Sequence, residues 1–245
     1  MGSMVSSATV PIGTTLPTPK SASGPWTDLG LTLPIFVLYH LGVVFLPVRN
    51  AADLVTRELV ALANQDLLAY SGLTLGVGAA FVGVLVVLGR GHALRSSRFV
   101  MIALEGIAYA LAMRLIAVWA VGHVTLSPGE VDSRFAGLVM SLGAGFYEEI
   151  AFRVLLFGMG GRLLIFLFPL ALPGSRTLLW LAWAIVSAAV FSGWHYIGAL
   201  GDEFELASFV FRFACGFVLT VIYVLRGFAP AVWTHALYDV WVLVL

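Results

Sequence analysis

Long apolar stretches alternate with short polar segments from residue 29 to residue 245. Each stretch runs for about 17–25 residues, which is the length that an α-helix needs to cross a bilayer. The stretches lie at 29–48, 67–89, 99–121, 135–158, 177–199, 206–225 and 228–245. The pattern predicts an all-α fold, a polytopic transmembrane helix bundle of about seven spans, with eight as the alternative.

Two further segments have a different pattern. Residues 50–66 are amphipathic, and we expect them to lie at the membrane interface. Residues 162–173 are apolar but too short to cross a bilayer alone, and Pro169 and Pro173 interrupt them. We expect this segment to be re-entrant or interfacial.

The composition supports the membrane assignment. Hydrophobic residues make up 60% of the chain and charged residues only 11%, with a mean hydropathy of +1.01. The 13 basic and 13 acidic residues balance, so no nucleic-acid partner is indicated. The single cysteine, Cys215, excludes an intramolecular disulfide and a cysteine-based metal cluster.

The N-terminal residues differ in composition from the rest. Met1 to Met4 have the character of a tag remnant, and residues 5–25 are rich in Ser, Thr and Pro without an apolar run. We therefore expect residues 1–25 to be a disordered cytosolic tail rather than a signal peptide. Residues 26–245 are expected to form a single transmembrane domain.

The distribution of arginine between the loops predicts the orientation of the spans, because basic residues accumulate in cytoplasmic loops. The loops on one side hold Arg90, Arg95, Arg98, Arg162, Arg176 and Arg226, whereas those on the other hold Arg49, Arg57 and Arg134. The first set should be cytoplasmic, as should the N-terminus. We expect a multi-pass protein of a bacterial cytoplasmic membrane.

Several ionisable side chains fall inside apolar spans, where they are costly and usually mark a functional site. They are Glu148, Glu149 and Arg153 in GFYEEIAFRVLLFG, His195 in VFSGWHY, and His235 and Asp239 in WTHALYD. Because water is scarce at this depth, we expect the three helices to converge so that these groups satisfy one another.

The spacing of these residues predicts different roles for the two adjacent glutamates. Glu149 and Arg153 are one helical turn apart and can pair, as can His235 and Asp239. Glu148 projects about 100° away from Glu149 and is left for another partner. This arrangement predicts a structural Glu149 and a catalytic Glu148. Hydrolysis by an activated water needs such a base together with a donor to the developing oxyanion.

The same residues resemble a known family. EEIAFR matches EExxxR, FSGWH matches FxxxH, and HALYD stands where HxxxN is found in the CAAX protease and bacteriocin-processing family of glutamate-type intramembrane proteases. The motifs occur in the family's order within residues 135–245, which the resemblance makes the catalytic core. It also implies a conical active-site cavity among the C-terminal four spans.

The resemblance implies a role for each residue. Glu148 corresponds to the catalytic glutamate, which activates a water together with His195. Glu149 and Arg153 correspond to the supporting ion pair, and His235 to the histidine that stabilises the oxyanion. Asp239 replaces the usual Asn, and we expect it to orient His235, because an ionised Asp cannot donate a hydrogen bond.

The sequence therefore predicts an intramembrane endopeptidase. Its substrate would be a membrane-anchored protein or peptide precursor cut near its C-terminus or in a leader, and no cofactor or metal is expected. Two alternatives stay open. One is a zinc-dependent intramembrane protease, although HExxH is absent. The other is a non-enzymatic bacteriocin-immunity or scaffold protein, or a proton-coupled transporter, although no inverted repeat is evident.

Overall fold

The computed structural model describes residues 25–46, 49–53, 55–88, 95–122, 133–168, 174–198 and 201–245. All regular structure in these ranges is helical. The helices are α1 (Pro25–Leu31), α2 (Leu33–Val43), α3 (Thr56–Leu62), α4 (Leu67–Leu88), α5 (Ser96–Val121), α6 (Arg134–Gly143), η1 (Ala144–Glu148), η2 (Ile150–Met159), α7 (Gly160–Leu167), α8 (Ser175–Trp194), α9 (Leu206–Arg226) and α10 (Phe228–Leu243). The expected tail, residues 1–24, lies outside the described residues.

Within the described ranges, six helical segments are long and apolar enough to cross a membrane. They are Trp26–Val43, Leu67–Val84, Ser96–Val121, Arg134–Leu167, Ser175–Trp194 and Leu206–Arg226. The seventh predicted stretch corresponds to α10, whose 16 residues extend about 24 Å, less than a bilayer core. The prediction of a polytopic helical bundle is confirmed.

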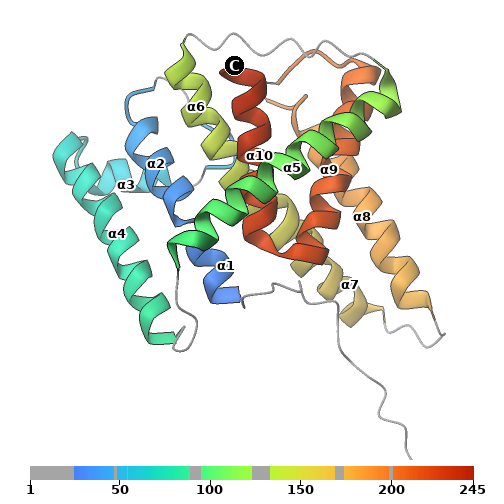
Figure 1. Cartoon of the computed structure of the whole chain (residues 1–245), viewed down its shortest axis with the longest axis horizontal. Helices are drawn as coiled ribbons and strands as arrows, with labels where there is room; N and C mark the ends of the chain where they lie inside the picture. Colours follow the sequence, from blue (N-terminus) through green and yellow to red (C-terminus); the bar gives the residue numbers. More distant parts are fainter. Residues whose placement is uncertain are drawn as a thin grey trace, which may run out of the picture.

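Helix α10 lies in the middle of the bundle, next to α5, α6, η1 and α9, whereas α4 lies at the edge (Figure 1). Small residues on α10 allow its neighbours to approach closely, and Ala229, Ala231 and Val232 have no exposed surface. Helix α4 leaves Leu68 and Val86 largely exposed. This contrast indicates that α10 is a core element and that α4 faces the lipid.

Contacts with α1 hold the N-terminus of α10 in place. The Asp28 carboxylate accepts hydrogen bonds from the backbone N–H groups of Phe228 and Ala229, and Trp233 Nε1 donates to the Leu31 carbonyl at 2.9 Å. Gly227 has a φ of 109°, and a Cβ there would lie 2.7 Å from Asp28 Oδ2. Only glycine fits this turn, and Asp28 satisfies N–H groups that the helix leaves free.

The run from Arg134 to Leu167 is continuous, and this corrects the predicted end of the fourth span at 158. Residues 162–167 extend this helix rather than forming a separate re-entrant piece; residues 169–173 lie outside the described part. Gly160 and Gly161, which precede these residues, do not break the helix but let it pack closely against α8. A Cβ on Gly161 would lie 2.3 Å from the Trp180 ring, and one on Gly160 would lie 3.1 Å from Trp183.

Candidate active site

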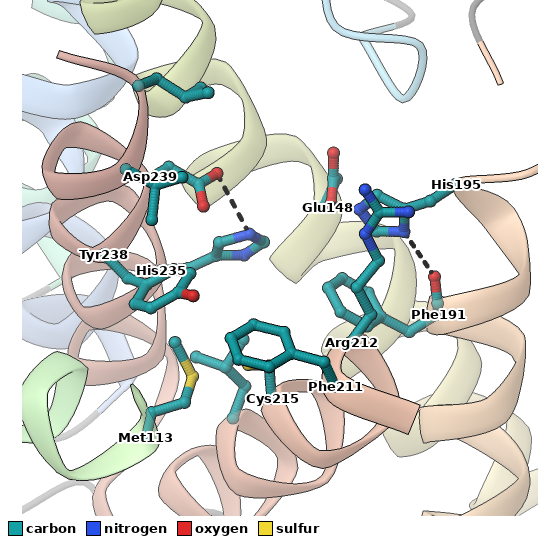
Figure 2. A pocket seen from close by; sticks show the side chains of 13 residues that line it. Met113, Glu148, Phe191, His195, Phe211, Arg212, Cys215, His235, Tyr238 and Asp239 are labelled. Carbon is teal, nitrogen blue, oxygen red and sulfur yellow. Dashed lines mark hydrogen bonds and ion pairs between the residues drawn. The ribbon is translucent and has the colours of Figure 1, made fainter. Parts of the chain in front are cut away.

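A cavity of about 180 Å³ opens inside the C-terminal part of the bundle (Figure 2). Helices α5, α8, α9 and α10 and the η1 segment contribute to its walls. Its polar lining consists of Glu148, His195, Arg212, Cys215, His235, Tyr238 and Asp239. Figure 2 shows Glu148 and His195 on one side of this space and His235 with Asp239 on the other.

The glutamate pair lies where the helix changes its winding. Segment η1 ends at Glu148 and η2 begins at Ile150, and both are π-helical. Such segments have hydrogen bonds between residues five apart and are frequent at functional sites. Gly143 and Gly145 permit close packing here, because added Cβ atoms would lie 2.3 Å from Tyr39 and 2.6 Å from Ala236. In the structure they bring α2 and α10 against the glutamates.

Glu149 is fully buried, and its carboxylate contacts two basic side chains. Its Oε1 atom lies 3.1 Å from Arg153 Nη1 and 2.7 Å from His235 Nδ1. Arg153 is itself 1% exposed, donates to the Gly216 carbonyl at 3.2 Å, and lies over the Phe191 ring at 4.3 Å. The i, i+4 pair is therefore present, and it is sealed between η2, α8, α9 and α10.

Glu148 has a different environment, although it is only 6% exposed. Its Oε1 atom accepts a hydrogen bond from Asn50 Nδ2 at 2.8 Å. Its Oε2 atom has no hydrogen-bond partner among the described residues and lies 3.9 Å from His195 Nε2. That distance is too long for a direct hydrogen bond, but both atoms are within reach of one common point.

His195 follows directly after α8, which ends at Trp194 and not at the predicted residue 199. Its Nδ1 atom lies 2.9 Å from the Phe191 carbonyl, and because a carbonyl only accepts, Nδ1 must carry the hydrogen. In the neutral ring, Nε2 then has a free lone pair that faces Glu148. The Phe191 ring packs against both histidines, with centroid distances of 5.1 Å to His195 and 5.8 Å to His235.

His235 lies between two carboxylates. Its Nδ1 atom contacts Glu149, and its Nε2 atom lies 3.5 Å from Asp239 Oδ2. Both ring nitrogens face acceptors, an arrangement that favours the doubly protonated imidazolium. The structure thus brings together all six residues singled out in the sequence.

The sequence analysis missed Asn50 and did not place Arg212 at the site. Asn50 is not ionisable and belongs to a segment that we had assigned to the interface, so no charge within a span pointed to it. Arg212 pairs with Asp202, lies 5.2 Å from the Tyr196 ring and also lines the cavity.

The zinc alternative can be compared with the arrangement of donors. In the part of the chain that the structure describes, no three His, Cys, Asp or Glu side chains are grouped so that they could hold a metal ion. A zinc site with three protein ligands would therefore require the side chains at this cavity to rearrange.

Residues 130–241 match the family described as Rce1-like: type II CAAX prenyl endopeptidase Rce1-like. The match includes the three motifs and every residue from Glu148 to Asp239 discussed above. No curated protein and no solved structure is matched. The C-terminal segment is thus similar to the CAAX proteases, as the motifs predicted. The similarity supports a protease function of this general type in a multi-pass membrane protein.

Proposed function

We propose that the protein is a glutamate-type intramembrane endopeptidase that cuts a membrane-anchored protein or peptide precursor. The observation that supports this most is the difference between the two adjacent glutamates. Glu149 is paired with Arg153 and His235 and does not line the cavity, whereas Glu148 lines the cavity and has its unpaired Oε2 atom 3.9 Å from His195. A free carboxylate beside an imidazole lone pair can take a proton from water.

In the proposed first step, a water lies between Glu148 Oε2 and His195 Nε2. The water oxygen attacks the carbonyl carbon of the scissile bond, and its proton moves to Glu148 or His195. The carbonyl oxygen then carries the negative charge of a tetrahedral intermediate. Burial of the site strengthens every electrostatic interaction with this charge.

His235 is the proposed donor to that oxyanion. Its Nδ1 atom is held by Glu149, and its Nε2 atom is only loosely engaged by Asp239 at 3.5 Å, so Nε2–H can reach a substrate oxygen. Asp239 orients the ring. The proton held by Glu148 or His195 then passes to the leaving nitrogen, the C–N bond breaks, and a carboxylate and an amine result.

The site would act on a substrate that enters from the bilayer. With the arginine-rich loops in the cytoplasm of a bacterium, the end of α8 and the segment 201–205 lie on the outer side. The cavity near His195 would then receive an exported substrate, cut near its C-terminus or in its leader. The N-terminus would be cytoplasmic.

The test compares membranes of a gene-deletion strain that carries wild-type protein or Glu148→Gln. Mass spectrometry should find termini that appear only with the wild type, and a quenched fluorescent peptide spanning the cut should be cleaved by the purified protein. Glu203→Gln, a change in an exposed loop residue, is the matched control. Cleavage that persists in Glu148→Gln would refute the proposal.

The same assay separates the alternatives. Cleavage that is lost with a strong chelator and restored by Zn²⁺ would favour a metalloprotease. Identical termini in both strains, together with no cleavage by the purified protein, would favour a non-enzymatic role.

A further inference from the structure

A buried polar network joins the N-terminal helices to the cavity. It comprises Tyr39 and His40 of α2, Asn50 and Asp53 of the following loop, Thr56 of α3, Tyr70 of α4 and Tyr147 of η1, all of them buried. His40 lies 2.6 Å from the Tyr147 hydroxyl and 3.2 Å from that of Tyr70. This network lies outside the three motifs, apart from its contact with η1.

Asp53 organises the loop that carries Asn50. Its Oδ1 atom accepts the backbone N–H groups of Val55 and Thr56 at 2.9 Å, and its Oδ2 atom accepts the hydroxyls of Tyr39 and Thr56. Burial by itself would raise the pKa of Asp53, but these hydrogen bonds outweigh burial and hold its pKa below the usual range. Asp53 is therefore ionised and acts only as an acceptor.

The orientation of the Asn50 amide follows from its neighbours. Its Oδ1 atom accepts the Ala52 N–H at 2.8 Å, which leaves Nδ2 as the group that faces Glu148. The Asn50 backbone N–H in turn lies 3.4 Å from the Tyr39 hydroxyl, which donates to Asp53. The donor that contacts Glu148 is thus held from two sides.

We propose that Asn50 is a positioning residue that fixes Glu148 for catalysis and that the Asp53-centred loop keeps Asn50 in place. By holding Oε1, the Asn50 amide leaves Oε2 directed at His195 and the cavity. Asn50 lies outside the matched segment 130–241, so the first helices of the chain complete the site. This inference rests on the catalytic role proposed above for Glu148.

The proposal is tested with Asn50→Ala and Asn50→Asp in the purified full-length protein. Removing one hydrogen bond that positions a charged catalytic group corresponds to a loss in rate of about 10- to 100-fold. Asn50→Ala should lower kcat by this factor with little change in KM. The control is Asn64→Asp, the chain's other asparagine, which is exposed and should leave kcat unchanged.

Asn50→Asp keeps the size of the side chain but places a second carboxyl against Glu148. Two adjacent carboxyls resist double ionisation. Labelling of Glu148 by dicyclohexylcarbodiimide, which reacts with protonated carboxyls, should therefore extend to higher pH than in the wild type. This readout needs no substrate. The other titratable or charged groups around Glu148 are Glu149, Arg153, His195, Arg212, Cys215, His235 and Asp239, and none of them is changed.

The outcomes distinguish this inference from the proposed function. Loss of cleavage in Glu148→Gln, together with normal kcat and unchanged labelling in both Asn50 variants, would overturn only the role of Asn50. Activity in Glu148→Gln would refute the proposed function, and labelling alone would then show whether Asn50 contacts Glu148. If neither variant folds, as judged by Tm and gel filtration, Asn50 is a folding residue and the inference is wrong.

Discussion

Arg153→Ala should strongly destabilise the protein, because Arg153 and its partner Glu149 are both buried. The substitution removes the 3.1 Å contact with Glu149 and the hydrogen bond to Gly216. It also removes the packing over Phe191. Glu149 keeps His235 as a partner, 2.7 Å away. Breaking a buried pair from one side costs about 3–5 kcal/mol. Since one partner remains, we expect about 3 kcal/mol.

A compensating double variant separates the contribution of the buried charges to stability from that of side-chain packing. Arg153→Leu with Glu149→Gln removes both charges and keeps apolar volume over Phe191. Replacing both members of a buried pair is often nearly neutral for stability. The double variant should therefore recover much of the stability lost in Arg153→Ala. It should not recover cleavage, because Glu149→Gln removes the negative charge that lies beside His235.

The assay is unfolding of the purified protein in mixed detergent micelles, with the free energy of unfolding compared among wild type, Arg153→Ala and the double variant. Cleavage of the fluorescent peptide is measured on the same samples. Arg134→Ala, at the exposed start of α6, is the control. Wild-type stability and activity in Arg153→Ala would show that the pair contributes nothing, and the argument from burial would be wrong.

Three further predictions concern other parts of the molecule. His195→Ala should reduce cleavage by about 10²- to 10⁴-fold while leaving Tm nearly unchanged, since a partner of the attacking water is lost; near-normal cleavage would remove His195 from the mechanism. Asp28→Ala should cost about 1–2 kcal/mol by uncapping α10, and Asp28→Asn, which keeps an acceptor oxygen, should cost less in the same unfolding assay; equal stability of all three proteins would contradict the capping role. For the orientation, single cysteines at Ser97 and Glu203 in a Cys215→Ala background are treated on intact cells with a membrane-impermeant thiol reagent. Labelling only at residue 203 would support a cavity that opens to the outer side of the membrane. Labelling only at residue 97 would show that the protein has the opposite orientation.

The sequence alone was sufficient for the class of fold and for the six polar residues of the motifs. The positions of the helices can be predicted from the length and hydropathy of each segment, because a chain in lipid must satisfy its backbone hydrogen bonds within the segment. Ionisable residues inside such segments are conspicuous for the same reason. The i, i+4 pair of Glu149 and Arg153 is also a local feature, since it depends only on helical spacing.

Other features were decided by tertiary packing. The π-helical winding around Glu148, the continuation of the helix to Leu167 and the end of α8 at Trp194 depend on what lies beside each segment. The second partner of Glu149 and the contact between Asn50 and Glu148 join residues 86 and 98 positions apart. Asn50 carries no charge that makes it stand out in an apolar chain. Only when the loop after α2 folds back onto η1 does its amide meet a carboxylate, because that encounter depends on the packing of helices rather than on spacing within one of them.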